Sequence, residues 1–358
     1  MINVVKPTLP KLEEYVTYLQ KIWETSFLTN NGPLVTELEG QLKKYFDVKF
    51  LRIVSNGTIA LQIAIKSLAL EGEIITTPFS HVATLNSILW QNCKPVFVDI
   101  ELHSFCIDAS KIEAAISDRS CAILATHVYG FPCQVEDIEK LANKYGLKVI
   151  YDGAHAFGVK LKNQSILKYG NVSTLSFHAT KIFNSIEGGA IISDCEKTDQ
   201  KCMEIRYFGL NNEIPDTLGI NGINSEFHAA MGLCNLPKVN MFIKKHHEIY
   251  NLYNAILKNL TLKFPNHLND IEYNFSYFPI IFPSEKKLIF IKDVLNKAGI
   301  YPRRYFYPSL NKLSFNTGNN CPIAESISER VLCLPLYNDL SLEDAERIAR
   351  LIVENYDD

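Results

Sequence analysis

The chain of 358 residues has an ordinary globular composition, 47% apolar and 21% charged, and its length allows one large and one small domain. Its formal net charge of −3 excludes a general basic field for nucleic acid, so local basic groups must bind any anionic ligand. No apolar run is long enough to span a bilayer, and the N-terminus lacks the features of an export signal. We therefore expect a cytoplasmic protein.

The cysteines and histidines give little support to disulfides or metals. The nine cysteines are scattered and contain no CxxC pair, which indicates reduced, mostly structural thiols. The nine histidines form no HxxxH pattern and no cluster with cysteine, so we expect no metal site. His246 and His247 are expected on an exposed helix.

The chain opens with helices and a first candidate for phosphate binding. Residues 12–24 and 35–46 are predicted helices, and residues 28–33 between them have the composition of a turn. A short strand at 51–54 then leads through a small polar turn into a helix at 59–70. This arrangement suits phosphate, because N–H groups at the helix start and the helix dipole attract an anion. An ordinary capped helix has the same pattern.

Strands and helices alternate from residue 51 to residue 177, which predicts a mostly parallel sheet with helices on both faces. The further expected strands are 74–77, 95–100, 121–126, 147–151, 172–177 and 190–193, and the expected helices are 85–91 and 135–145.

The C-terminal third has a different pattern, with a long helix followed by shorter elements. The helix is predicted at 231–256 and should link two domains. The elements after it are strands at 261–264 and 273–282 and helices at 287–297 and 342–354. We therefore divide the chain into a large domain, 1–240, and a small α+β domain, 241–358.

Two of the predicted strands deliver polar residues to the same edge of the sheet. Asp152 follows one strand, and Lys181 lies in a Ser/Thr-rich turn after the next, at the carboxyl ends where ligands bind in α/β sheets. This pair suits pyridoxal phosphate (PLP): the lysine can form a Schiff base with the aldehyde, and the carboxylate can keep the pyridinium nitrogen protonated. Taken singly, such an Asp is more often a helix cap and such a Lys a solvated residue.

Three motifs around this pair make the pattern specific. They are Asp-Gly-Ala-His-Ala-Phe-Gly at 152–158, Ser-Phe-His-Ala-Thr-Lys at 176–181 and Glu-Gly-Gly-Ala at 187–190. Together they resemble the signature of the DegT/DnrJ/StrS aminotransferases. The resemblance covers almost the whole chain, and includes Leu-Pro-Leu-Tyr at 334–337. It implies a fold-type-I PLP-dependent enzyme: a large domain with a mostly parallel seven-stranded sheet, a smaller α+β C-terminal domain, and a homodimer with active sites at the interface.

For the coenzyme, the resemblance implies Lys181 as the attachment point and catalytic base, with Asp152 at the ring nitrogen. It implies as further coenzyme ligands Gly57, Thr58, His81, His155, Ser176 and, across the dimer interface, Asn224. Two of these depart from the usual family pattern. His81 stands where an aromatic residue usually stacks on the ring, and His155 where Gln is common. An imidazole can stack in the first position and donate a hydrogen bond in the second.

For the substrate, the resemblance points to a second group of residues. They are Thr29, Asn30, Glu187, Arg303, Arg304 and Tyr305. A guanidinium suits the phosphates of a nucleotide sugar, but Arg303 and Arg304 have equally the pattern of a solvated pair. Which of the two would meet a substrate stays open.

The resemblance implies transfer of an amino group from L-glutamate to a nucleotide-linked keto sugar. Members that dehydrate or deoxygenate the sugar typically carry His in place of Lys181, so the lysine favours transamination. The run 176–189 resembles the branch that converts dTDP-4-keto-6-deoxyglucose to dTDP-4-amino-4,6-dideoxyglucose for O-antigen in lipopolysaccharide biosynthesis. A 3-keto sugar, a UDP sugar, or an amino acid substrate of another fold-type-I enzyme are the alternatives. An oxidoreductase would carry GxGxxG after its first strand, and the chain has none there.

Overall fold

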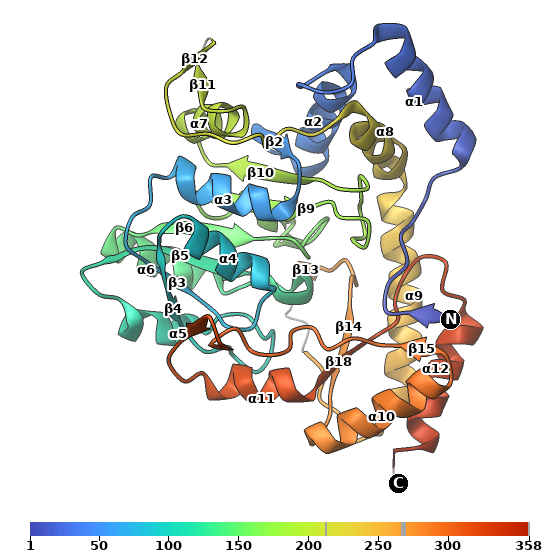
Figure 1. The fold of residues 1–358 in the computed structure, drawn as a ribbon. Coiled ribbons are helices and arrows are strands. Elements are labelled where there is room, and N and C mark those ends of the chain that lie inside the picture. Colours follow the sequence, from blue (N-terminus) through green and yellow to red (C-terminus); the bar gives the residue numbers. More distant parts are fainter. Residues whose placement is uncertain (212, 266–269, 357–358) are drawn as a thin grey trace.

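The computed structural model describes residues 1–211, 213–265 and 270–356. Its central sheet has seven strands in the order β2-β10-β9-β6-β5-β3-β4 (Figure 1). In that order they are Phe50–Val54, Gly189–Ser193, Val172–Ser176, Lys148–Asp152, Ser120–Thr126, Glu73–Thr76 and Lys94–Phe97. β10 is antiparallel to β2 and β9, and the other neighbours are parallel. The predicted α/β fold with a mostly parallel seven-stranded sheet is confirmed.

Apolar side chains cover both faces of this sheet, because successive residues of a strand point to opposite sides. In β5, Leu124 packs in the cluster that includes residues of α3 and α7, and Ile123 packs in the cluster that includes α2 and α6. The helices around the sheet are α2 (Pro33–Phe46), α3 (Gly57–Ser67), α4 (Val82–Trp90), α6 (Val135–Tyr145) and α7 (Glu196–Arg206). Burial on both faces fixes the register of the strands and therefore the positions of the residues that follow them.

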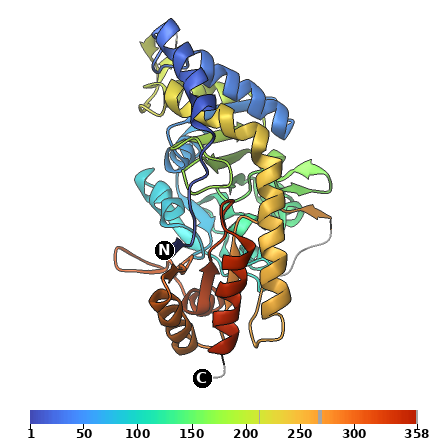
Figure 2. The same ribbon diagram turned by 90° about the vertical axis from the view of Figure 1, so that its right-hand side faces the viewer.

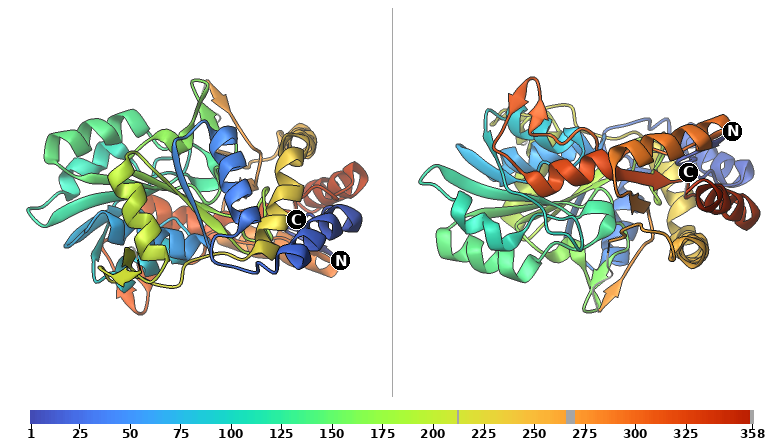
Figure 3. Two further views of the ribbon diagram at one scale, coloured as in Figure 1. Left: turned by 90° about the horizontal axis from the view of Figure 1, so that it is seen from above. Right: turned by 90° about the horizontal axis from the view of Figure 1, so that it is seen from below.

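One long helix connects the region of the central sheet to the C-terminal part of the chain. In Figure 1, α9 (Val239–Leu257) runs from the side of the sheet toward the C-terminal helices, and Figure 2 shows α12 (Leu342–Glu354) beside it. A two-stranded antiparallel sheet joins β14 (Phe278–Ile281) to β18 (Val331–Leu334). From below, α10 (Glu285–Lys297) and α11 (Pro322–Arg330) cover this end of the molecule (Figure 3, right).

The remaining elements are short, apart from two helices. These helices are α1 (Leu12–Thr25) and α8 (Glu226–Asn235). The short ones include α5 (Ala109–Ile112), β7 (Lys160–Leu161), β8 (Gln164–Ser165), β11 (Leu210–Asn211), β12 (Ile214–Pro215), β13 (Ile271–Glu272), β16 (Lys312–Leu313) and β17 (Asn316–Thr317). No helix in the described ranges combines the length and apolar character that crossing a membrane requires.

Three predictions for the C-terminal third need correction. The single helix at 231–256 is two helices, α8 and α9, separated by a 3-10 turn at Leu236–Lys238 that contains Pro237, because proline removes a helical N–H and clashes with the preceding turn. The strand at 273–282 is confined to β14, and at 261–264 only an isolated bridge from Lys263 to Ile281 forms. His246 faces inward and is buried, with Nδ1 3.1 Å from the carbonyl oxygen of Phe275.

The N-terminal residues pack on the C-terminal part of the chain. β1 (Ile2–Asn3) pairs in parallel with β15 (Ile300–Tyr301). The carbonyl of Val4 accepts the N–H of Leu336 at 3.0 Å. These local pairings are too short to give a sequence pattern. The division between residues 240 and 241, which falls in the first turn of α9, stays a prediction.

Candidate active site

A cavity of about 610 Å³ lies at the carboxyl ends of the central strands. Its walls come from the ends of β6 and β9, from the starts of α3 and α4, and from Arg303, Tyr305 and Phe306 of the C-terminal part. The predicted site residues that line it are Gly57, Thr58, His81, Asp152, His155, Ser176, Lys181, Glu187, Arg303 and Tyr305. The fold therefore brings together most of the residues that the sequence singled out.

Lys181 is half-buried in the wall of this cavity. Its Nζ donates a hydrogen bond to the hydroxyl of Tyr277 at 3.3 Å. Burial lowers the pKa of Lys181 to about 8, and the negative charge of Asp152 opposes this shift. A lysine with such a pKa has a neutral, nucleophilic fraction near neutral pH, as attack on an aldehyde requires.

The lowered pKa predicts how Lys181 reacts in the coenzyme-free protein. Only the neutral amine reacts with an acetylating reagent, so its labelling should rise with pH through a midpoint near 8. Lys140 is the control: it is exposed on α6, and its partner Asp137 raises its pKa above 10.5. Mass spectrometry of labelled peptides over a pH series gives both midpoints. Coincident midpoints for the two lysines would contradict the shift.

Asp152 is 4% exposed and receives hydrogen bonds on both carboxylate oxygens. Oδ1 accepts the N–H of Ala154 at 3.1 Å, and Oδ2 accepts the hydroxyl of Thr84 at 2.8 Å. The Thr84 oxygen is 2.7 Å from Ser80 Oγ, which is 2.9 Å from Thr126 Oγ1. An ionised carboxylate only accepts, so each hydroxyl donates toward Asp152. This buried chain fixes the carboxylate and stabilises its negative charge.

Substitution of Thr84 tests the importance of this chain. Thr84→Val keeps the shape but removes the donor to Asp152, and we expect kcat/KM for catalysis at this site to fall by about tenfold, as loss of one hydrogen bond to a charged group implies. Thr84→Ser keeps the hydroxyl and should restore most of the activity. Steady-state kinetics of both variants decide the matter, and equal activity of the Val variant and the unaltered protein would contradict the role.

Two of the three histidines that line the cavity, His81 and His155, are neutral donors. His155 is 8% exposed, its Nδ1 accepts the N–H of Tyr129 at 3.1 Å, and burial lowers its pKa well below the ordinary value. Its proton therefore lies on Nε2. His81 caps α4 through Nδ1, which accepts the N–H of Ala83 at 3.2 Å, and burial lowers its pKa. Each ring thus keeps an Nε2–H donor for a ligand.

The start of α3 fits a phosphate. The Asn56 side chain accepts the N–H of Ile59 at 2.9 Å, and the N–H groups of Gly57 and Thr58 have no hydrogen-bond acceptor among the described residues, as expected for a first helical turn. A Cβ added to Gly57 would lie 2.9 Å from Cβ of Ser176. Only a glycine lets the backbone at position 57 approach Ser176 this closely, and its N–H group and the Ser176 hydroxyl together form a cradle suited to an anion.

The structure leaves Thr29, Asn30, Asn224 and Arg304 outside the cavity wall. The Asn224 amide donates to the carbonyl oxygens of Val54 and Glu187 at 3.3 and 3.2 Å. Thr29 Oγ1 lies 3.5 Å from the Asn224 carbonyl, and Asn30 is in the turn before α2 with φ 64°. These four side chains therefore do not line the cavity within one chain, and their predicted roles stay predictions.

Arg303 and Arg304 point to different places. Arg304 donates to Glu285 and to the carbonyl of Glu329, both at 2.7 Å, so a half-buried ion pair occupies its guanidinium. Arg303 lines the cavity and has no carboxylate partner among the described residues. The predicted substrate role therefore fits Arg303 and does not fit Arg304.

Sequence analysis missed several residues of the site. The hydroxyl chain joins three segments and left no motif, although the spacing of Ser80 and Thr84 across a helix start was visible. Tyr277 is the residue immediately before β14, and no local sequence pattern indicated that it belongs to the site. His178, whose Nε2 is 3.5 Å from the carboxylate of Glu187, was visible in the motif but had no assigned role.

The lysine and the carboxylate at the strand ends, with the anion cradle at a helix start, form the kind of site that is expected in a PLP-dependent aminotransferase. Residues 11–353 match the DegT/DnrJ/EryC1/StrS aminotransferase family. The chain belongs to this family, whose members are PLP-dependent in general. No three His, Cys, Asp or Glu side chains in the described part of the chain gather in a way that could hold a metal ion.

Individual relatives agree with this assignment along the full length of the chain. The chain is 42% identical over 369 residues to the dTDP-4-amino-4,6-dideoxy-D-glucose transaminase of Escherichia coli, covering 98% of both. It is 40% identical over 365 residues to the transaminase of the same name from Shigella dysenteriae, covering 99% of this chain and 98% of that one. A Bacillus subtilis structure with bound cofactor PMP is 28% identical, with a TM-score of 0.88 over 96% of this chain and 81% of that chain.

Proposed function

We propose that the protein is a PLP-dependent sugar-nucleotide aminotransferase. It moves the amino group of L-glutamate to dTDP-4-keto-6-deoxyglucose and gives dTDP-4-amino-4,6-dideoxyglucose. The observation that carries the proposal is that one cavity unites Lys181, the hydrogen-bonded Asp152 and the anion cradle at Gly57. The names of the Escherichia coli and Shigella relatives support the choice of sugar.

Different residues of the cavity bind different parts of the coenzyme. In this proposal Gly57, Thr58 and Ser176 hold its phosphate, Asp152 pairs with the ring nitrogen, and Lys181 is the point of covalent attachment. His155 donates Nε2–H to the ring hydroxyl, and His81 packs against the ring. When bound, PLP supplies an electron-accepting ring that stabilises negative charge on a neighbouring carbon.

Lys181 and Asp152 carry the chemistry that belongs to the protein. With a pKa of about 8, the Lys181 amine can take the proton from Cα of glutamate and later donate one, as a general base and then an acid. Asp152, fixed by Thr84 and the N–H of Ala154, holds the ring nitrogen protonated. Its orientation is set before the substrate arrives, which is the condition for electrostatic stabilisation.

The nucleotide sugar enters the same cavity. Arg303 faces its phosphates, while Glu187 and Tyr305 lie along the wall.

We also propose a homodimer with Asn224, Thr29 and Asn30 at the interface. Exposed large apolar side chains around α1 support it, because such a surface is usually covered by a partner. They are Leu12, Trp23, Phe27 and Leu28.

The adjacent arginines allow a matched comparison. Arg303→Ala should raise KM for the nucleotide sugar by about ten- to a hundredfold, as loss of a charged contact to phosphate implies, and leave KM for glutamate unchanged. Arg304→Ala breaks the half-buried pair with Glu285 and should lower the thermal midpoint without changing KM for the sugar. Kinetics with each substrate separate these effects. The reverse pattern would show that the substrate meets Arg304.

The proposal is tested by absorption spectroscopy of the PLP-loaded protein. We expect dTDP-4-amino-4,6-dideoxyglucose to convert the band of lysine-bound PLP to that of pyridoxamine phosphate, while the 3-amino counterpart does not. Conversion by the 3-amino sugar alone would move the reaction to a 3-keto sugar. If glutamate converted the band and neither amino sugar did, the proposed sugar substrate would be wrong, and the protein would still be an aminotransferase.

A further inference from the structure

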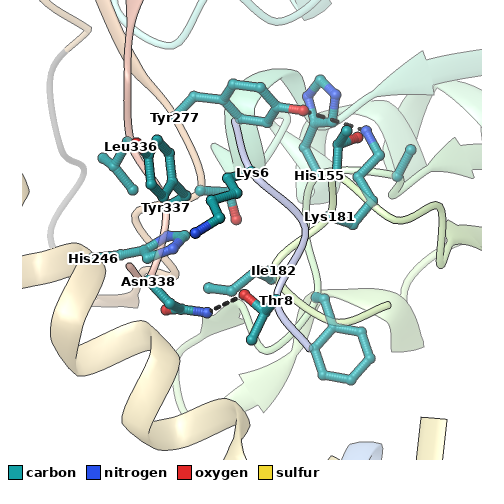
Figure 4. Close-up of a pocket in the computed structure, with 14 residues that line it drawn as sticks. Lys6, Thr8, His155, Lys181, Ile182, His246, Tyr277, Leu336, Tyr337 and Asn338 are labelled. Atoms are coloured by element: carbon teal, nitrogen blue, oxygen red, sulfur yellow. Dashed lines mark hydrogen bonds between the residues drawn. The ribbon is translucent and has the colours of Figure 1, made fainter. Parts of the chain in front are cut away.

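A second, narrow cavity of about 20 Å³ lies against Lys181 (Figure 4). The residues that line both cavities, and so form the wall between them, are Ala154, His155, Thr180, Lys181 and Tyr277. On the other side of this wall the small cavity is bounded by the N-terminal residues Lys6 and Thr8, by His246 of α9, and by Asn338. Its volume is that of a site for one water molecule.

The lining of the small cavity offers a water several polar partners. Ser276 Oγ and Asn338 Oδ1 are buried and have no hydrogen-bond partner in the described part of the chain. Burial lowers the pKa of His246 to about 4, so the ring is neutral, and its Nδ1 proton points to the carbonyl of Phe275. A hydroxyl that can donate and an amide oxygen that can accept are complementary to one water, and unpaired they would destabilise the fold.

The outer wall of the small cavity reaches the surface. The Lys6 side chain is 59% exposed and pairs with Asp339 at 2.9 Å. Asn338 donates to Thr8 Oγ1 at 2.6 Å, and the Thr8 carbonyl accepts the amide of Asn184 at 3.1 Å. The N-terminal segment therefore lies between Lys181 and solvent and is tied to the turn that follows Lys181.

We propose that this small cavity is a water site through which Lys181 exchanges water and protons with solvent. The inference rests on the proposed function and assigns the small cavity a role in the proposed reaction. Forming a carbon–nitrogen double bond from a carbonyl and an amine releases one water, and the reverse consumes one. Lys181 must also lose and regain a proton in each half of the reaction. Because the coenzyme and either substrate occupy the large cavity in each half of the reaction, these exchanges use the opposite side of Lys181.

Crystallography of the unaltered protein tests the water site without reference to activity. We expect one ordered water within about 3.2 Å of Ser276 Oγ or Asn338 Oδ1. An empty cavity in a well-resolved map would overturn the proposal. This measurement does not depend on any substitution being tolerated.

An isotope experiment tests the exchange. L-Glutamate deuterated at Cα converts the loaded protein in one half-reaction, and mass spectrometry measures how much deuterium the released pyridoxamine phosphate retains. In the unaltered protein, Lys181 should lose most of the label to solvent. Ser276→Val fills the small cavity and should raise the retained fraction about threefold, since the competing exchange slows. The retained fraction is a ratio, so a uniform loss of rate does not change it.

Ser328→Val is the matched control, because Ser328 Oγ is also buried without a partner in the described residues but lies on α11, away from both cavities. It should leave retention unchanged. Equal retention in Ser276→Val and the unaltered protein would overturn the exchange route. Failure of glutamate to give pyridoxamine phosphate in the unaltered protein would instead refute the proposed function, and the crystallographic water would still decide the site.

Discussion

Lys181→Ala is expected to abolish transamination, with kcat/KM reduced by at least about 10³-fold, because the substitution removes both the covalent attachment and the general base. The variant should still bind PLP through the cradle at Gly57, Thr58 and Ser176, but without the absorption band of the lysine-bound form. Coupled assays of glutamate consumption and absorption spectra give the two results.

The control for this variant is Lys140→Ala, which removes an exposed lysine from α6 and should leave both the rate and the spectrum unchanged. Normal transaminase rates in the Lys181→Ala variant would refute the assignment of the lysine.

Asp152→Asn is expected to lower kcat by about 10³-fold, since a neutral amide cannot hold the ring nitrogen protonated and the preorganised charge is lost. The amide has nearly the same shape and can still accept from Thr84, so the protein should fold and bind PLP. Stopped-flow measurement of the glutamate half-reaction isolates the chemical step.

Asp99 supplies a control of the same kind. It is also a buried carboxylate after a strand, but it caps α11 by accepting the N–H groups of Ile323 and Ala324 at 2.9 and 2.8 Å. Asp99→Asn should lower the thermal midpoint and leave kcat nearly unchanged. If the Asp152 variant behaved in the same way, Asp152 would be a structural cap and not a partner of the coenzyme.

The parts of the fold that sequence predicts best are those with a long, regular signal. The apolar runs at 121–126, 147–151 and 172–177 are strands buried on both faces, and the structure has β5, β6 and β9 there within one residue. Asp152 is the last residue of β6, and Lys181 lies in the turn that follows β9. The position of each at the sheet edge therefore follows from local sequence and the parallel topology.

Other features depend on contacts between distant segments. The hydroxyl chain to Asp152 needs Ser80, just before α4, to meet Thr126 at the end of β5, and sequence separation hides this. Whether the side chain of Arg303 or that of Arg304 faces the cavity depends on the orientation of the extended backbone at these residues. Arg303 pairs through its backbone with Cys333, and neighbouring side chains of extended backbone point to opposite sides. The sequence indicated both arginines as candidates for substrate binding, but it could not show which of the two faces the cavity.

The N-terminal strand and the small cavity beside Lys181 are likewise invisible in the sequence. β1 is two residues long and has no periodicity to detect. The cavity exists only because residues 6–8, α9 and the loop at 336–338 meet behind Lys181. Its unpaired Ser276 hydroxyl becomes significant only when these neighbours are known.

The most direct test of the central claim is to locate PLP on the chain. The purified protein would be incubated with PLP, reduced with borohydride, digested and analysed by mass spectrometry. We predict that the reduced coenzyme is found on the peptide that contains Lys181 and that glutamate added before reduction removes it. Absence of the modification, or its presence on another lysine with Lys181 unmodified, would contradict the assignment of Lys181 as the residue around which this enzyme works.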